Sequence, residues 1–333
     1  MSRTTARRKK NHQSKGHKKP MAQVLLDESC VFFSQYKNDV SRNAYIKNYK
    51  KFIDFCRKNY NCKSKAECEE YIQDYVAYLV KSDKSAATIH TYLAPICAYH
   101  KISMAEIEKP IRKISDIKRS RNRDNRMIRS GQNYKNDKFK HLVCFQTAVG
   151  IRRAELKKIQ YDDLVVDESG YTCIRVKRGK GAKMQLQRIL PEDVDMVKEY
   201  FNTPGTGRLF KESDFDNKLD LHHLRALQAQ RAYKYYYNLL NTGNKAKDKE
   251  TADVFVEELK KRWDLYNKSK DGKTRKYPRS FTGVYKLRGD NRRKALSNGF
   301  AVEYDRLAVY MVSVFHLSHW RCDVTVDNYL IAK

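Results

Sequence analysis

The amino-acid sequence predicts a mainly α-helical protein with a small antiparallel β-sheet, an α+β fold divided between two domains. Apolar residues recur at helical spacing through residues 22–103. Three short runs rich in β-forming residues follow one another between residues 161 and 190. With 333 residues, the chain is long enough for two domains that each bury a core.

The first predicted domain spans residues 22–103 and consists of helices. Behind Ser41, a residue type that favours helix caps, one helical face holds Tyr45, Tyr49, Phe52, Ile53 and Cys56. Ser64 followed by Glu67 is typical of a capping box, and it predicts a second helix through Cys68, Tyr71, Ile72, Tyr75 and Leu79. A third helix passes Ile89, Tyr92, Leu93 and Ile96, where Pro95 predicts a kink or a split into two short helices.

Two basic segments flank this domain. Residues 1–20 contain eight Lys or Arg and no acid, which predicts a disordered tail. The tail is either an arm that grips DNA or, if Met21 is the true start, partly an artefact. Residues 104–136 are expected to form a linker, and we favour a strap across a phosphate backbone over a merely solvated connector. Its basic residues include Arg119, Arg121, Arg123 and Arg126.

The second predicted domain begins with a helix near 137–149. Three strands are expected at Tyr161–Val166, Tyr171–Val176 and Leu186–Leu190, with turns at Ser169-Gly170 and Gly179-Lys180-Gly181. Beyond Pro191 the pattern is helical, apart from a loop expected at Asn267–Ser280. Two apolar stripes in this region are expected to be core, namely Phe255, Leu259, Trp263 and Tyr266, and Leu307, Met311 and Val314.

The composition indicates a partner and a compartment. Lys and Arg total 69 against 39 Asp and Glu, a formal charge of +30, which favours nucleic acid over a plain solvated surface. The eight cysteines include no Cys-x-x-Cys pair, so they are expected to be reduced core thiols. Neither a carboxylate cluster nor Cys-His spacing indicates a metal site. No secretory signal or apolar span is found, which predicts an intracellular protein.

Four segments contain residues suited to breaking a phosphodiester, which requires cations for the phosphate oxygens, a proton donor and a nucleophile. Arg152 and Glu155 share one helical face, and Lys180 lies at the tip of the predicted hairpin. His222 and Arg225 are one turn apart at the start of a long helix. His319 precedes Tyr329 by ten residues (329 − 319 = 10). Each segment alone is common.

In this order the segments resemble the tyrosine recombinase (phage integrase) family, whose pattern is G-L-R-x-x-E-L, a G-K-G hairpin, H-x-L-R, L-G-H and Tyr. The corresponding segments here are Gly150–Leu156, Gly179–Gly181, His222–Arg225, Leu317–His319 and Tyr329. Two departures are visible. Ser318 stands where the family usually has Gly, and His319 lies 94 positions after Arg225 (319 − 225 = 94), which implies an insertion.

The resemblance implies a two-domain clamp, with a helical SAM-like core-binding domain at 22–103 and a catalytic domain at 137–333 with an insertion at about 240–300. It implies that Arg152 and Arg225 clamp the scissile phosphate, Lys180 protonates the leaving 5′ oxygen, His222 supports proton transfer, His319 binds the phosphate and Glu155 orients the site. Tyr329 would form a 3′-phosphotyrosine without any cofactor.

The resemblance also implies partners: a double-stranded DNA recombination site, a homo-oligomer forming a tetrameric synapse, and an accessory directionality factor. The expected setting is a phage or mobile element in the bacterial cytoplasm, at the nucleoid. The alternatives are a type IB topoisomerase, a catalytically silent DNA-binding regulator of the same fold and, less favoured, a metal-dependent nuclease.

Only four residues follow Tyr329, which suggests that the inserted segment couples one protomer to the next. The hypothesis rests on the length, the apolar stripe and the charge of the segment between Arg225 and His319, and deleting residues 243–280 would test it. Residues Lys286–Arg293 either touch DNA or a partner protomer, or form a solvated helix start.

Overall fold

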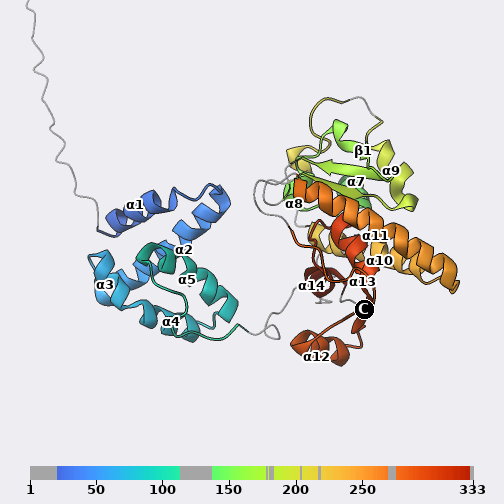
Figure 1. The fold of residues 1–333 in the computed structure, drawn as a ribbon. Coiled ribbons are helices and arrows are strands. Elements are labelled where there is room, and N and C mark those ends of the chain that lie inside the picture. The colour runs from blue at the N-terminus through green and yellow to red at the C-terminus, as the bar shows by residue number, and fades with distance from the viewer. Residues whose placement is uncertain are drawn as a thin grey trace, which may run out of the picture. The chain divides into compact units, whose positions relative to one another are not determined.

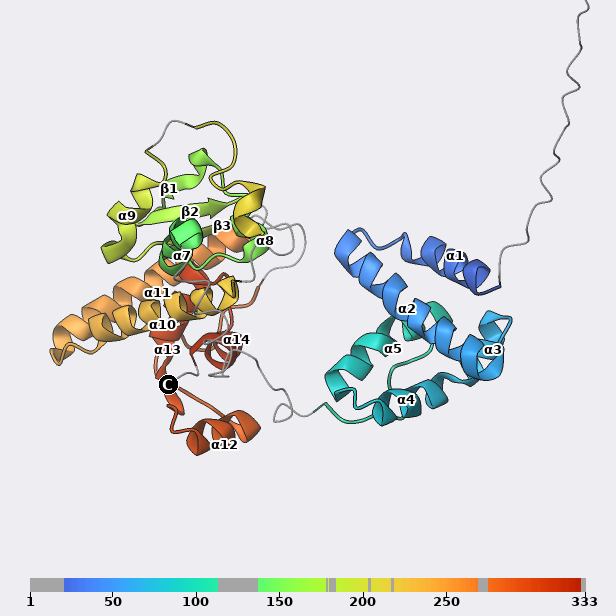
Figure 2. The same cartoon turned by 180° about the vertical axis from the view of Figure 1, so that it is seen from behind.

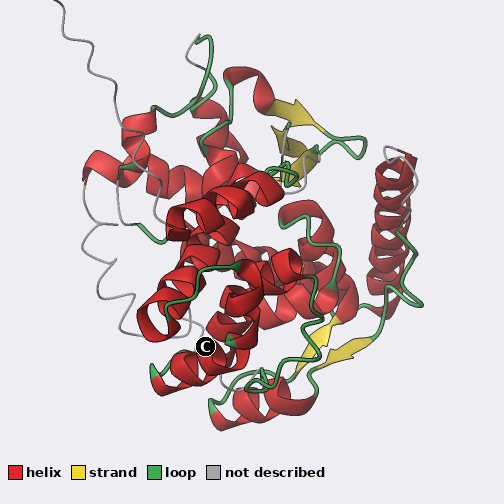
Figure 3. Cartoon of the chain, turned by 90° about the vertical axis from the view of Figure 1, so that its left-hand side faces the viewer, coloured by secondary structure: helices red, strands yellow, loops and turns green. Residues whose placement is uncertain are grey.

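The computed structural model describes residues 21–112, 137–177, 179, 184–202, 205–216, 219–268 and 275–330. The predicted tail at 1–20, Lys180 and the linker arginines Arg119, Arg121, Arg123 and Arg126 lie outside these residues. The chain divides into two units, Met1–Ile117 and Lys118–Lys333. Helices dominate both units and the strands are confined to two small antiparallel sheets (Figure 3), which confirms the predicted fold class.

The N-terminal unit is built only of helices within its described residues. They are α1 (Met21–Phe33), α2 (Asp39–Tyr60), α3 (Lys65–Glu70), α4 (Ile72–Lys81) and α5 (Ala86–His100) (Figure 1). Buried aromatic side chains of α1, α2 and α4 form its core, among them Phe33, Tyr49, Phe52 and Tyr75. Ile107 also packs into this core, so the unit continues past residue 103.

The start of α2 differs from the prediction. Asn38 is the N-cap, and its side-chain oxygen accepts a hydrogen bond from the backbone N–H of Ser41 at 3.1 Å. Ser41 therefore lies within the first turn, and the prediction that it caps the helix was wrong. Asn and Ser are comparable caps, so the apolar pattern alone could not choose between them.

Pro95 does not split the third helix, because α5 runs continuously from Ala86 to His100. A proline cannot donate the backbone hydrogen bond that the carbonyl four residues earlier would accept. Here that carbonyl belongs to Thr91, and it accepts a long hydrogen bond of 3.5 Å from the side-chain amide of Asn48 on α2. Packing against α2 thus supplies a replacement donor.

Ser64 is the N-cap of α3 as predicted, but the capping box is incomplete, because Glu67 accepts from the N–H of Lys63 and not from that of Ser64. The Ser64 hydroxyl accepts from the Glu67 N–H at 3.2 Å, and the Glu67 carboxylate accepts from the Lys63 N–H at 2.8 Å. The expected single helix is broken at Tyr71, however, so the face from Cys68 to Leu79 is shared between α3 and α4.

The second unit places a three-stranded sheet beside long helices. The sheet has the order β1 (Leu164–Val166), β2 (Thr172–Val176) and β3 (Gln185–Arg188), with Leu164 opposite Ile174 and Cys173 opposite Arg188. The three expected strands are therefore confirmed with shorter ends. The helices before and after the sheet are α7 (Asp137–Val149), α8 (Arg153–Leu156), α9 (Val194–Glu199) and α10 (Leu221–Leu240).

The region after α10 is less uniformly helical than expected. Two short strands, β4 (Val284–Lys286) and β5 (Glu303–Asp305), pair with Val284 opposite Asp305. They enclose α12 (Gly289–Ser297), the helix at the charged segment. The remaining elements are α11 (Lys245–Lys268), α13 (Arg306–Met311), the π-helical turn η6 (Val312–His316), α14 (Cys322–Thr325) and the π-helical turn η7 (Val326–Leu330).

Helix α11 of the inserted segment packs along α10 (Figure 2) and is part of the core. Phe255, Leu259 and Trp263 are at most 4% exposed, which confirms that these three residues of the stripe are core, whereas Tyr266 is only partly buried. Buried ion pairs also tie α11 to the sheet. Arg188 lies 2.7 Å from Asp167 and 2.6 Å from Glu258, while Arg262 lies 3.0 Å from Asp167.

The apolar stripe is consequently not available for contact with a neighbouring protomer, and deleting 243–280 would remove core and not a separable appendage. None of the helices within the described ranges has the length and apolar character needed to cross a membrane.

Candidate active site

The site begins where α7 ends at Gly150. This glycine has a φ of +61°, and a Cβ here would lie 2.9 Å from Oε1 of Gln228 on α10. Glycine therefore suits both the left-handed backbone and the close approach of α10. The turn places Arg152 at the N-cap of α8, with Glu155 one turn later.

Arg152 and Glu155 form an ion pair of 2.7 Å between Nη1 and Oε1. The Glu155 side chain is 4% exposed and that of Arg152 is 20% exposed. A buried carboxylate beside a half-buried guanidinium limits how the guanidinium can turn. This geometry fits the positioning role that the resemblance implies for Glu155.

Arg225 projects from the first turns of α10 and is fully buried. Its Nη1 donates to the Gly150 carbonyl, and its Nη2 donates to the Leu317 carbonyl at 2.7 Å. Its Nε is buried without a hydrogen-bond partner among the described residues. A guanidinium offers five N–H groups, so a donor remains after the two carbonyl contacts are made.

The Leu317 carbonyl joins the two guanidiniums, since Nη2 of Arg152 also points to it at 3.4 Å. Burial lowers the pKa of Arg225 from its usual value, and the positive charge of Arg152 acts in the same direction. A guanidinium nevertheless keeps its proton in proteins. Two cations that repel each other make a site that an anion would stabilise.

Tyr329 lies in η7 with its ring among three of these side chains. Its hydroxyl is 3.0 Å from Nε2 of His319. Its ring centroid is 5.4 Å from the His222 ring and 5.7 Å from the Arg225 guanidinium carbon. Gln230 of α10 donates to the Tyr329 carbonyl at 3.0 Å, which holds the backbone of η7 against α10.

The loop that presents His319 has two residues in the left-handed region, Ser318 with a φ of 51° and Trp320 with a φ of 62°. Ser313 supports it: its carbonyl accepts from the His319 N–H at 2.8 Å, and its hydroxyl accepts from the Arg321 N–H at 2.9 Å. Position 318 therefore has a conformation that glycine adopts more easily than serine. This gives a physical reason for a Gly in the related pattern.

A second histidine, His316, was missed by the sequence reasoning. It is fully buried, with Nδ1 2.9 Å from Gln228 Nε2 and Nε2 3.1 Å from the Tyr236 hydroxyl. Burial, followed by the charges of Arg188 and Arg225, lowers its pKa to about 3. His316 is thus a neutral support beneath the loop, and no sequence signal distinguished it from an ordinary core residue.

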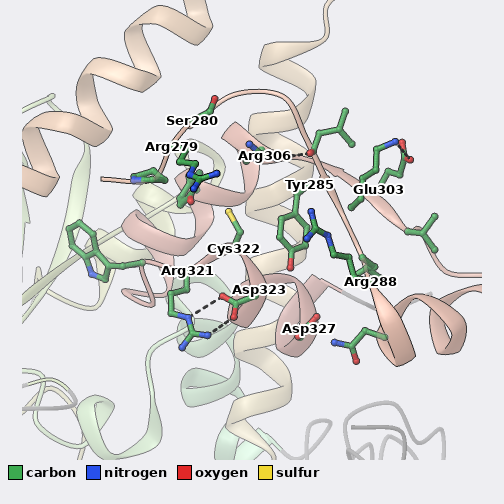
Figure 4. A pocket seen from close by; sticks show the side chains of 18 of the residues that line it. Arg279, Ser280, Tyr285, Arg288, Glu303, Arg306, Arg321, Cys322, Asp323 and Asp327 are labelled. Atoms are coloured by element: carbon green, nitrogen blue, oxygen red, sulfur yellow. Dashed lines mark hydrogen bonds and ion pairs between the residues drawn. The ribbon is translucent and has the colours of Figure 1, made fainter. Parts of the chain in front are cut away.

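A cavity of about 1030 Å³ is lined in part by the segment that leads to Tyr329 (Figure 4). Its walls combine the inserted region with that segment, and they include Arg279, Tyr285, Arg288, Arg321, Asp323 and Asp327. Arg321 turns toward Asp323 in an ion pair. None of the six described catalytic candidates lines this cavity.

Of the seven catalytic residues predicted from the sequence, six are described and are linked to one another by the contacts above. They are Arg152, Glu155, His222, Arg225, His319 and Tyr329, and they come from four segments spread over residues 152–329. Lys180 lies outside the described residues. The roles of all seven stay predictions.

No protein-family model and no curated protein matches this sequence. Among solved structures, the crystal structure of XerA recombinase is similar with a TM-score of 0.26 and 17% identity, over 64% of this chain and 85% of that chain. The XerH site-specific recombinase bound to difH substrate, a pre-cleavage complex, has a TM-score of 0.37 and 16% identity, over 65% of this chain and 74% of that chain. Both of these proteins are recombinases by description.

Proposed function

We propose that this chain is a tyrosine-type site-specific DNA recombinase that cleaves and rejoins strands through a 3′-phosphotyrosine on Tyr329. One observation supports this most directly. The Tyr329 hydroxyl is within hydrogen-bond distance of His319, at 3.0 Å, in a site with two arginines that share the Leu317 carbonyl. A nucleophile, a candidate base and two fixed cations meet where a phosphate would fit.

The two guanidiniums bind the scissile phosphate in this proposal. Arg225 has an unused buried Nε–H, and Arg152 is held by Glu155 at 2.7 Å. Both stay charged at any working pH and donate in planar pairs, which matches phosphate oxygens. The charge that develops on the non-bridging oxygens is then met by donors already in position.

The chemical step transfers one phosphoryl group. The Tyr329 oxygen attacks phosphorus, the bond to the 5′ oxygen breaks, and the phenol proton leaves. A phenol is protonated at neutral pH, since its ordinary pKa is about 10, so a base helps. His319 Nε2 is in reach to take that proton, which extends the phosphate-binding role implied by the resemblance.

The leaving oxygen needs a proton in return. The resemblance assigns this donation to Lys180 and a supporting role to His222, whose ring lies 5.4 Å from that of Tyr329. The phosphodiester energy stays in the tyrosyl link. The 5′ hydroxyl of a second strand can therefore attack it and restore both phosphodiester and phenol without a cofactor.

Partners follow from charge and from the resemblance. A formal charge of +30 favours binding to a double-stranded recombination site, with affinity that falls steeply as salt rises. The proposal also includes a tetrameric synapse and an accessory directionality factor. It places the protein in a bacterial cytoplasm, where it would recombine the DNA of a phage or mobile element. These parts of the proposal rest on the family pattern alone.

The deciding experiment uses a nicked suicide DNA substrate, which traps the covalent intermediate by losing the 5′ hydroxyl fragment. Wild-type protein should give a protein–DNA adduct on a denaturing gel. Tyr329→Phe should bind the same DNA in a mobility-shift assay and give no adduct. Tyr285→Phe, a cavity-lining tyrosine away from Arg152 and Arg225, is the matched control and should give the wild-type adduct.

Other outcomes identify the alternatives. An adduct that persists in Tyr329→Phe would refute the assignment of the nucleophile. DNA binding without an adduct in the wild type would favour a silent regulator, and cleavage without an adduct would favour a nuclease. Relaxation of supercoils with no exchange between two DNA sites would favour a type IB topoisomerase.

A further inference from the structure

Three cysteines of the N-terminal unit gather in one place, far along the chain from the catalytic segments. Cys56, Cys62 and Cys68 are all buried, and their sulfur atoms lie within 4.8 Å of one another. Cys56 is on α2, Cys62 is in the connection after α2, and Cys68 is on α3. None of them takes part in the proposed DNA chemistry.

The backbone turns sharply to bring them together. Helix α2 ends at Tyr60, and its C-cap Asn61 has a φ of 52° and donates its N–H to the Arg57 carbonyl. Cys62 follows immediately, and Ser64 then caps the start of α3. Two separate local devices, a left-handed C-cap and an N-cap, therefore direct three thiols into a single cluster.

The spacing of the sulfur atoms suits a soft metal ion. In a tetrahedral site with Zn–S bonds of about 2.3 Å, the sulfur atoms lie about 3.8 Å apart. The sulfur atoms in the structure are at most 4.8 Å apart, so each pair would approach by at most about 1 Å on binding zinc, and side-chain rotation can supply this movement. Thiolates are also the ligands that select zinc over harder cations.

Zinc binds cysteine as the thiolate, and a bound dication deprotonates the thiols that coordinate it. Water as a fourth ligand would complete the tetrahedral shell around the three thiolates.

We propose that Cys56, Cys62 and Cys68 form a structural zinc site that fastens the end of α2 to the start of α3. The ion takes three thiolates from the protein, and each thiol gives up its proton on binding. The site stabilises the N-terminal helical unit and has no part in phosphoryl transfer, so this inference is independent of the proposed function.

The test measures metal in the full-length protein purified without chelator. Zinc determined by mass spectrometry should be about one ion per chain, and cobalt substitution should give a thiolate-to-cobalt charge-transfer band. Cys62→Ser should lower the zinc content about tenfold or more. Cys97→Ser is the matched control, because Cys97 is a buried thiol of the same unit outside the cluster.

The melting temperature gives a second readout. A chelator should lower it in the wild type and in Cys97→Ser, and should leave Cys62→Ser unchanged. The cobalt band of the wild-type protein decides the matter even if Cys62→Ser fails to fold. Wild-type protein that binds neither zinc nor cobalt after reconstitution would overturn the proposal. So would a mass lower by two hydrogen atoms, which would indicate a disulfide, or full zinc retention in Cys62→Ser.

Discussion

Replacing Arg225 separates the structural and the catalytic use of one guanidinium. The Arg225→Ala change leaves the buried Gly150 carbonyl without its donor and leaves the Leu317 carbonyl with only the longer contact from Arg152, at 3.4 Å. A buried polar group left unsatisfied costs about 1–3 kcal/mol, so the change costs at most about 6 kcal/mol. The Arg225→Lys change keeps the charge and can satisfy one carbonyl, which halves the expected cost to at most about 3 kcal/mol.

Catalysis should respond differently from stability. An ammonium cannot donate to a carbonyl and a phosphate oxygen in the fixed plane of a guanidinium. Cleavage of the suicide substrate by Arg225→Lys should therefore fall about 100- to 1,000-fold, as when a preorganised donor is lost. Urea unfolding measures stability, and cleavage is compared at matched amounts of folded protein.

Arg231→Lys serves as the control for both measurements, because Arg231 lies on the same helix and pairs with Asp193 and Glu192 instead of the site. It should cleave like the wild type. Wild-type cleavage by Arg225→Lys would refute the phosphate clamp. An unchanged free energy of unfolding in Arg225→Ala would show that its contacts with Gly150 and Leu317 do not hold the site together.

Three further changes test the surroundings of the site. Ser318→Gly should raise the free energy of unfolding by up to about 1 kcal/mol in urea, since glycine accepts the φ of 51° without strain. Burial lowers the pKa of His316 to about 3. Below about pH 6.5 this histidine is therefore protonated in the unfolded chain but not in the folded chain, so the free energy of unfolding decreases as the pH is lowered. His316→Gln should reduce that slope, measured by urea unfolding between pH 4 and 6, by up to about 1.4 kcal/mol per pH unit. Glu258→Gln should cost about 3 kcal/mol in thermal unfolding, because it removes a carboxylate from the buried Arg188; no loss would mean that Asp167 alone suffices.

Local features of the fold were largely predictable from the sequence. Helical spacing located α2, α5, α7 and α10, and the alternating runs located β1 to β3. The errors have different causes: some depend on contacts distant in sequence, and others on elements too short to show a pattern. Asn48 compensates for Pro95 from another helix, and β4 and β5 are three residues each, too short for alternation to be visible.

The site itself could not be assembled from spacing. Arg152 and Tyr329 are far apart in the sequence, and only the family resemblance suggested that they meet. The ion pairs from Arg188 to Asp167 and Glu258 gave no local signal either. The cysteine cluster escaped notice because six-residue steps from Cys56 to Cys62 to Cys68 differ from the short Cys-x-x-Cys spacing of common metal sites.

The acceptor shared by the two guanidiniums belongs to the main chain, and this affects how it can be studied. Any amino acid at position 317 supplies the same carbonyl, so a substitution there would report on how well the buried Leu317 side chain packs. A comparison of residue types across related proteins would not detect the contact between the Leu317 carbonyl and the two arginines either. The contact between this carbonyl and the two arginines would respond to changes that displace the backbone, such as substitutions at the left-handed positions Ser318 and Trp320. It would also respond to replacement of the peptide bond after Leu317 by an ester.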